Sequence, residues 1–245
     1  MISKNKIKYF RSLQIKKFRE AHQKLLVYGK KIVQDLAANH PQHIIEIMGL
    51  DEFAPYFDRT NLPFTTTDEK TLKQISGLTS PPPLIAHCHF PSSTDKAAPQ
   101  PLLLYLDDIQ DPGNLGTILR TANWYGHHHI LLSPRCADRY NPKVIQSSMG
   151  AVFDLFIEIL EGYEMVAKYP QYRLIAAHLE GVPPTKIVPH PYDIVIIGNE
   201  GQGVHPEILK ITHINLRLPG RPNPMTESLN AAISAGIICY NWDMK

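Results

Sequence analysis

The chain has 245 residues, a formal net charge of +2 and 43% hydrophobic residues, enough to bury the core of one large domain or two modest ones. No apolar run approaches the length of a membrane-spanning helix, and residues 1–14 lack the apolar centre of a secretory signal, so we expect a cytoplasmic protein without a membrane segment. Three scattered cysteines argue against a disulfide framework, and twelve histidines without ligand spacing predict no metal site.

The first part of the chain is strongly basic. Ten basic residues and one acid lie between positions 4 and 31, with aromatic residues interleaved. This pattern is typical of a surface that binds nucleic-acid phosphates, although a solvated helix face would carry the same charges. The residues that we expect to contact RNA are Lys16, Lys17, Arg19, Lys30 and Lys31.

Residues 1–97 are predicted to form a small mixed α/β domain that ends in a linker. Hydrophobic periodicity and turn residues indicate its elements. They are a helix over 15–36 with a break near Tyr28 and Gly29, strands over 44–48 and 64–66, a helix over 68–75 and an apolar stretch over 84–88. Residues 91–101 are rich in serine, alanine and proline, as expected of a linker between domains.

Residues 98–245 alternate between strands and helices, which predicts a second domain with a parallel sheet covered by helices. Strands are expected over 102–106, 128–132, 153–159, 173–177, 193–197 and 213–218. Helices are expected after Asn114, which is a suitable cap, over 141–149 and 162–168, after Pro206, and from Thr226 to Trp242.

A glycine-rich loop follows the buried strand at 193–197. Gly198, Gly201 and Gly203 permit a sharp turn or a close approach of the backbone to a ligand, and a strand, a loop and a helix in this order place a ligand at the carboxyl end of a sheet. A purely structural turn would use the same glycines. Glu200 lies between Gly198 and Gly201 and favours a functional site over a structural turn, because its carboxylate can hold backbone amides, an arginine or a hydroxyl. The spacing differs from the dinucleotide and phosphate-loop motifs, so neither an NAD enzyme nor a nucleotide hydrolase is supported.

The last predicted helix is apolar on nearly every side. Ile233 and Ile237 follow helical spacing, but Ala231, Ala235 and Ile238 make the remaining faces apolar too. Such a helix must be covered from more than one direction. A second copy of the chain would supply this cover in a homodimer, and burial within one subunit is the alternative.

Three stretches resemble the SpoU/TrmH family of RNA ribose 2′-O-methyltransferases. They are NLGTILRTANWYG from Asn114, IVIIGNEGQGV from Ile194, and LRLPG from Leu216 followed by TESLNAAISAGI. Their order and spacing match the three motifs of that family, and NPKVIQSSMGA from Asn141 is also similar to it. The resemblance implies a trefoil-knotted parallel-sheet methyltransferase domain over 98–245, preceded by a small α/β (L30e-like) RNA-binding domain over 1–97. It also implies S-adenosylmethionine as cofactor and a homodimer formed through the terminal helix.

The same resemblance implies the residues of the site. The catalytic set is Arg120, Asn114, Glu200, Ser228 and Asn230. The cofactor-binding set is Ile197, Gly198, Asn199, Gly201, Gly203, Leu216, Leu218 and Leu229. Arg120 is expected to contact the target hydroxyl and a neighbouring phosphate, while Glu200 holds the arginine and the loop amides. Residues 221–225 depart from the family pattern by lengthening or stiffening the approach to the third motif.

Three alternatives remain open at this stage. Ribosomal RNA is favoured as the substrate, with transfer RNA as the alternative. A noncatalytic RNA-binding or assembly protein would keep the fold, but it would not need all five polar groups of the catalytic set. A base methyltransferase of a related knotted family would carry different motifs.

Overall fold

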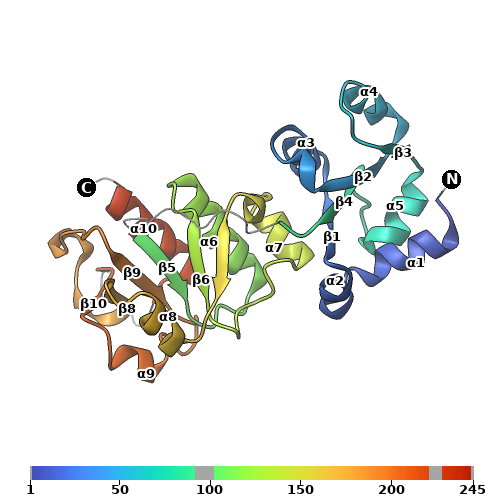
Figure 1. The fold of residues 1–245 in the computed structure, drawn as a ribbon. Coiled ribbons are helices and arrows are strands. Elements are labelled where there is room, and N and C mark those ends of the chain that lie inside the picture. The colour runs from blue at the N-terminus through green and yellow to red at the C-terminus, as the bar shows by residue number, and fades with distance from the viewer. Residues whose placement is uncertain (1, 92–101, 221–227, 244–245) are drawn as a thin grey trace. The chain divides into compact units, whose positions relative to one another are not determined.

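The computed structural model describes residues 2–91, 102–220 and 228–243, and Figure 1 shows their fold. Contacts divide the chain into two compact units, Met1–Ser92 with Tyr140–Phe153, and Ser93–Arg139 with Asp154–Lys245. Residues 140–153, which the sequence pattern places in the second domain, therefore pack with the first unit. The expected cap Thr226 and the segment 221–225 lie outside the described residues.

The first unit contains a four-stranded sheet. Its strands are β1 (Lys24–Tyr28), β4 (Leu84–His89), β2 (Ile44–Gly49) and β3 (Phe64–Thr66), in that spatial order. The β1–β4 and β4–β2 pairs are antiparallel, and β2–β3 is parallel. Its helices are α1 (Lys4–Ser12), α2 (Lys16–His22), α3 (Lys30–Asn39), α4 (Ala54–Phe57), α5 (Glu69–Ser76) and α7 (Pro142–Ser147). Phe10, Leu26, Leu72 and Ile85 belong to a core cluster on one face of this sheet.

The helix expected over 15–36 with a break near Tyr28 and Gly29 is wrong over 24–28, which form a strand. Gln23 adopts a left-handed conformation with φ 53° and ends α2, and Gly29, with φ 104°, begins α3. Between them, Lys24–Tyr28 forms β1, whose apolar residues are buried and whose partner β4 lies about sixty residues later in the chain. Long-range pairing therefore overrides the local helical pattern.

The second unit is built on a six-stranded sheet, which confirms the predicted α/β architecture. Its strands are β10 (Ile214–Leu216), β8 (Arg173–Val182), β9 (Asp193–Ile197), β5 (Leu102–Leu106), β6 (His129–Leu132) and β7 (Phe156–Ile159), in that spatial order. Every neighbouring pair is parallel. The central strands β5 and β9 are buried along their whole length, as near-continuous apolar strands of parallel sheets are. The knot that the resemblance implies stays a prediction.

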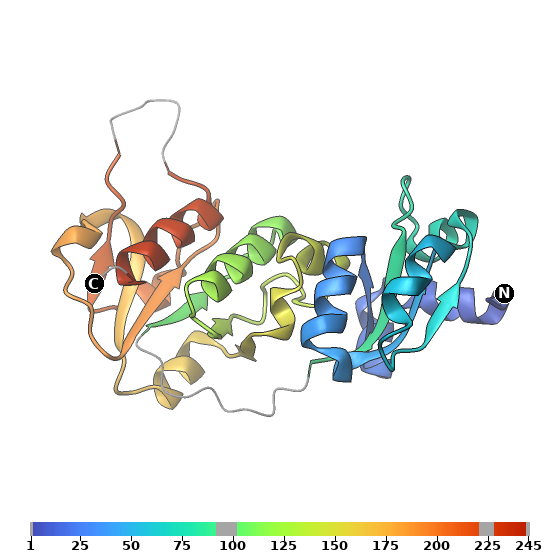
Figure 2. The ribbon, with the colours of Figure 1, turned by 90° about the horizontal axis from the view of Figure 1, so that it is seen from above.

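Helices pack on this sheet and differ from the predicted ones chiefly at their starts. They are α6 (Pro112–Trp124), α8 (Gly162–Lys168), α9 (Pro206–Leu209) and α10 (Ala231–Asp243). Helices α6 and α10 pack against each other, side by side in Figure 2. Asp111, not Asn114, caps α6 by accepting the Asn114 amide at 2.8 Å. The last helix begins at Ala231 rather than at Thr226, and the Asn230 side chain accepts the amides of its first turn.

A buried carboxylate ties α10 to the sheet. Asp193 is fully buried at the start of β9, and it accepts hydrogen bonds from Arg173 Nε at 2.8 Å and Trp242 Nε1 at 3.1 Å. The His190 amide donates to the same carboxylate at 2.9 Å. This buried charge is therefore compensated from three directions, which fixes the end of α10. Within the described ranges, no helix is long and apolar enough to cross a membrane.

Candidate active site at the carboxyl edge of the parallel sheet

The carboxyl ends of β5 and β9 place two polar segments side by side. Leu106 ends β5 and is followed by Asp107 and Asp108, while Ile197 ends β9 and is followed by the glycine loop. The Asp107 amide donates to the Ile197 carbonyl at 2.9 Å, so the two chains stay paired beyond the strands. This edge is where ligands bind in open parallel sheets.

The glycine loop closes on itself through Asn199. The Asn199 amide donates to the Gly203 carbonyl at 3.1 Å, and the Gly203 amide donates back at 2.9 Å. The Asn199 side-chain oxygen accepts the amides of Gly201 at 2.8 Å and Gln202 at 3.2 Å. Asn199 therefore holds the loop amides, whereas the sequence predicted that Glu200 would hold them.

The three glycines of the loop have different surroundings. A Cβ at Gly198 would lie 2.2 Å from backbone atoms of Gly203 and Val204, so the loop closes only because residue 198 has no side chain. A Cβ at Gly201 would meet nothing closer than 3.5 Å, and one at Gly203 would meet nothing within 4 Å. Gly203 requires glycine for a different reason, its φ of 71°. The outer part of the loop therefore presents open backbone, which fits a ligand that approaches main-chain atoms closely.

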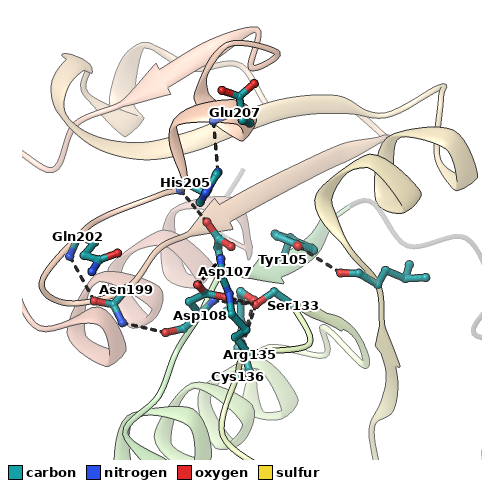
Figure 3. A network of polar contacts seen from close by, with 12 residues as sticks. Tyr105, Asp107, Asp108, Ser133, Arg135, Cys136, Asn199, Gln202, His205 and Glu207 are labelled. Carbon is teal, nitrogen blue, oxygen red and sulfur yellow. Dashed lines mark hydrogen bonds and ion pairs between the residues drawn. The ribbon is translucent and has the colours of Figure 1, made fainter.

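The two aspartates after β5 hold both ends of this loop, as Figure 3 shows. Asp107 is 3% exposed, and its Oδ2 accepts the His205 amide at 2.7 Å. The Asp108 carbonyl accepts Asn199 Nδ2 at 2.9 Å. Burial raises the pKa of the Asp107 carboxyl. The sequence interpretation did not include this clamp, and the available signal was a pair of acids directly after a buried strand.

Asp108 is itself fixed by neighbouring groups. Its φ of 58° is unusual for a residue other than glycine. Ser133, at the end of β6, donates its hydroxyl to Asp108 Oδ1 at 2.7 Å and accepts the Asp108 amide at 2.9 Å. Arg135 Nη2 lies 2.8 Å from Asp108 Oδ2. Three adjacent strands therefore contribute to positioning the loop.

Three of the five expected catalytic residues form one hydrogen-bonded chain. Asn114 Nδ2 donates to Glu200 Oε1 at 2.5 Å, and Asn230 Nδ2 donates to Asn114 Oδ1 at 3.0 Å. The residues are 86 and 116 positions apart in sequence, and each comes from a different one of the three stretches described above. Asn230 also caps α10, so the start of that helix is tied to α6 and to the glycine loop.

The other two expected catalytic residues lie on the same elements without joining this chain. Arg120 is exposed on α6, two turns after Asn114, and among the described residues its guanidinium makes no ion pair or hydrogen bond. Ser228 is exposed two residues before Asn230. Glu200 contacts Asn114 rather than Arg120, which differs from the expected contact. An uncommitted guanidinium on α6 is suited to an anionic partner such as a phosphate.

The expected cofactor residues divide by exposure. Ile197 and Leu216 are buried within their strands, so a ligand at this edge would meet their backbone only. Leu218 is half-buried, and Leu229 is 47% exposed. Contacts between these residues and a cofactor stay a prediction. The described residues contain no group of three or more histidine, cysteine, aspartate or glutamate side chains placed to hold a metal ion.

The expected RNA-binding residues lie in the first unit and differ in exposure. Lys16, Lys17, Lys30 and Lys31 are exposed. Arg19 is only 3% exposed, and its Nη1 donates to the carbonyls of Leu13 at 2.9 Å and Gln14 at 2.7 Å. Its guanidinium therefore holds the corner between α1 and α2, and RNA contact through it does not fit this placement.

Comparison with known families settles the class of the chain. The SpoU rRNA Methylase family matches residues 101–240, and the MRM3-like substrate binding domain matches residues 4–86. The chain belongs to the SpoU rRNA methylase family. The match to the first of these families contains Asn114, Glu200 and Asn230, which the structure joins by hydrogen bonds.

Individual SpoU relatives cover the chain to different extents. The 23S rRNA (guanosine(2553)-2′-O)-methyltransferase RlmP of Bacillus subtilis is 30% identical over 240 residues, covering 96% of this chain and 95% of that protein. The mitochondrial rRNA methyltransferase 3 of Homo sapiens is 31% identical over 173 residues, or 65% of this chain and 41% of that longer protein.

Solved structures show the same SpoU architecture. A TrmH-family chain from Porphyromonas gingivalis has a TM-score of 0.86 at 32% identity and covers 99% of this chain and 98% of that one. The SpoU methyltransferase AviRb of Streptomyces viridochromogenes was solved with its cofactor AdoMet. It has a TM-score of 0.86 at 21% identity and covers 99% of this chain and 98% of that one, which shows that the two chains share a fold.

Proposed function

We propose that this SpoU family member transfers a methyl group from S-adenosylmethionine to a ribose 2′-hydroxyl of ribosomal RNA. The observation that carries the proposal is the chain of hydrogen bonds from Asn230 through Asn114 to Glu200, beside a glycine loop whose outer backbone is open. Ribosomal RNA is preferred to transfer RNA because the relative that matches nearly the whole chain, RlmP, is named for 23S rRNA.

The glycine loop and the start of α10 are the parts of the chain that would hold the cofactor. Gly201 and Gly203 offer unobstructed backbone, and Asn199 keeps that backbone in place through its two accepted amides. Leu218 and Leu229 supply apolar side chains that are not fully buried in the fold. When bound, S-adenosylmethionine supplies an electrophilic methyl group. The residues of the chain must therefore bring a ribose oxygen into line and help it lose a proton.

Arg120 is the residue that we place at the target hydroxyl. Its charge is not neutralised by any described carboxylate, because Glu200 is engaged with Asn114. Arginine stays protonated at neutral pH, so it is a poor base. Its planar fork can instead bind the hydroxyl and a neighbouring phosphate of the RNA, stabilising the developing alkoxide while the phosphate takes up or relays the proton. Asn114 and Asn230 would orient the ribose, and Ser228 would contact the substrate or cofactor end.

The four exposed lysines of the first unit supply the RNA-binding surface. Lys16 and Lys31 form only exposed ion pairs, with Glu20 at 3.7 Å and Asp35 at 3.2 Å, and exposed pairs are worth little in water. Their ammonium groups can therefore exchange these partners for phosphates. Replacing all four lysines by glutamine should weaken RNA binding and flatten its salt dependence, because fewer counterions are released, while cofactor affinity stays unchanged.

We also propose that two copies associate through α10. Its side chains Ile233, Ile237 and Tyr240 are 55%, 38% and 51% exposed, and Trp124 on the neighbouring α6 is 83% exposed. Exposed large apolar side chains of this kind are costly in a monomer and are suited to an isologous interface. The catalytic residue Arg120 lies on the same helix as Trp124, so the site would lie close to the interface.

Mapping of 2′-O-methyl groups tests the function. The experiment compares ribosomal RNA from cells with and without the gene. The first candidate for the methylated nucleotide is the equivalent of guanosine 2553 of 23S rRNA, for which the relative RlmP is named. The proposal expects one ribose methyl group to disappear from ribosomal RNA and to return with the parental gene but not with an Arg120→Ala variant. An unchanged ribosomal RNA map with a lost transfer-RNA methyl group would favour the alternative substrate.

A further inference from the structure

Helix α2 exposes its phenylalanine and buries one of its four charged residues. Arg19 is the buried residue of this helix, whereas Phe18 is 39% exposed. The carbonyls of Leu13 and Gln14 help to account for the burial of Arg19, because both accept hydrogen bonds from its Nη1. The fold does not use Phe18 in the same way, since no aromatic ring in the described part of the chain contacts it. An amphipathic helix normally has the opposite arrangement, so the exposed phenyl ring requires another explanation.

Phe18 belongs to a group of side chains that we call the α2 stripe, which consists of the exposed Ile15, Phe18 and His22 and the half-buried Tyr9. Ile15, Phe18 and His22 are spaced by three and four residues, which places them on one face of the helix. Ile15 is 56% exposed, and His22 is exposed as well. The His22 ring meets the half-buried Tyr9 ring edge-on, with centroids 5.2 Å apart. The stripe therefore offers flat rings and an aliphatic side chain next to one another.

The charges around the α2 stripe are mainly positive. Lys16 and Lys17 precede Phe18 directly, and Lys8 and Arg11 are exposed on the neighbouring helix α1. The acid on α2, Glu20, is exposed and lies 3.7 Å from Lys16. An apolar partner protein would gain nothing from these cations, whereas a nucleic acid would place its phosphates on them and its bases on the rings.

We propose that the α2 stripe is a stacking platform for unpaired bases of the RNA, with Phe18 as its central ring and Lys16 and Lys17 as phosphate contacts. The inference rests on the proposed function and specifies its substrate, which must present a loop, bulge or end to the first unit. Bases in a duplex are already stacked on one another, so a fully paired RNA cannot use the platform. The surface thus selects by strandedness, and the stacking is tolerant of base identity.

The test measures binding of two RNA probes to the full chain by fluorescence anisotropy over a series of salt concentrations. One probe is a hairpin with a large adenine-rich loop that carries 2-aminopurine, and the other is a blunt duplex of the same length. Phe18→Ala should weaken hairpin binding by roughly five- to a hundredfold, the range for one stacked base, with the slope against salt unchanged. Duplex binding should stay as it was. Phe18→Trp should restore hairpin binding, and quenching of 2-aminopurine should be lost only in the alanine variant.

Two control variants separate stacking from charge and from general damage. Tyr56→Ala removes another ring of the same unit, 47% exposed but flanked by the acids Glu52 and Asp58, and it should bind both probes normally. Replacing Lys16 and Lys17 by glutamine should lower the salt slope for both probes. Circular dichroism melting checks that every variant folds.

The outcomes distinguish the platform from the function on which it rests. Normal hairpin binding by Phe18→Ala, or an equal loss on hairpin and duplex, would overturn the stacking platform and leave the RNA-binding proposal in place. An equal loss in Tyr56→Ala would also overturn it. If the parental chain bound neither probe, both the platform and the RNA-binding surface of the first unit would be refuted.

Discussion

Replacing Gly198 by alanine is the substitution for which the structure gives the sharpest expectation. The added methyl group would lie 2.2 Å from the Gly203 carbonyl carbon and the Val204 amide nitrogen, and 2.3 Å from the Gly203 carbonyl oxygen. These atoms belong to the backbone, so they cannot rotate away as a side chain would. The loop must open to accommodate the methyl group.

The magnitude follows from what is lost when the loop opens. The paired hydrogen bonds between Asn199 and Gly203, 3.1 and 2.9 Å long, contribute about 1 kcal/mol each. Overpacking adds about 1–3 kcal/mol when the surroundings can adjust only partly. The resulting cost of about 3–5 kcal/mol for the closed loop lowers cofactor affinity by roughly a hundredfold to several thousandfold. The free energy of unfolding falls as well, because the same contacts belong to the native state.

Gly201→Val is the matched variant. Its nearest neighbour would be Asn199 Oδ1 at 3.5 Å from the Cβ position, so the folded chain has room for the new side chain. We expect unchanged unfolding but weaker cofactor binding, because the side chain projects into the open part of the loop that the cofactor is proposed to occupy. Calorimetric titration with S-adenosylmethionine and denaturant unfolding measure the two quantities. Parental affinity in Gly198→Ala would refute the steric reasoning, and parental affinity in Gly201→Val would remove this part of the loop from the cofactor site.

Four further predictions concern other parts of the molecule. Arg120→Lys keeps a charge but loses the planar fork, so single-turnover methylation should fall by roughly a hundredfold or more while calorimetry finds parental cofactor affinity. Ile233→Lys places a charge on the exposed face of α10, so sedimentation at micromolar concentration should find a monomer, whereas we expect the parental chain to sediment as a dimer. Asp193→Ala leaves the partly buried Arg173 without its carboxylate, which should lower the free energy of unfolding by about 3 kcal/mol in urea titrations. Burial lowers the pKa of His87 from 6.5 to about 4, so the unfolded chain binds this proton at a higher pH than the folded chain does. The free energy of unfolding should therefore decline as the pH falls from 6.5 towards 4, and His87→Gln should make that decline shallower.

Much of the fold of the second unit could be predicted because its signals are local. The strand at 193–197 has the bounds that its apolar, β-branched run predicts, and the alternation of strands and helices indicates the parallel sheet. In the first unit, the helix expected over 68–75 is α5, and Asp68 caps it by accepting the Thr71 amide. The strand at 24–28 was missed because its stability comes from pairing with β4, which local periodicity does not report.

The structure brings three of the expected site residues together, through contacts that differ from the expected ones. Asn114 looked like a helix cap, yet Asp111 has that role, and this leaves the Asn114 side chain to join Glu200 and Asn230. Both side chains are good caps, and the signal that distinguishes them is Pro112, because proline is favoured at the first position of a helix and so marks Asp111 as the cap. The pair of acids after the strand at 102–106 indicates a polar site, but the contact between Asp107 and the His205 amide could not be predicted, because it depends on which strands are neighbours in the sheet.

Transfer of a labelled methyl group from S-adenosylmethionine to ribosomal RNA, followed by alkaline hydrolysis, tests the central claim most directly. A methyl group on the ribose 2′-oxygen blocks cleavage of the next phosphodiester bond, so the label should appear in an alkali-resistant dinucleotide. The Arg120→Ala variant should bind the cofactor and transfer almost no label. Label in single nucleotides, or transfer by Arg120→Ala at the parental rate, would contradict the proposed reaction, and cofactor binding without any transfer to RNA would favour a noncatalytic member of the fold.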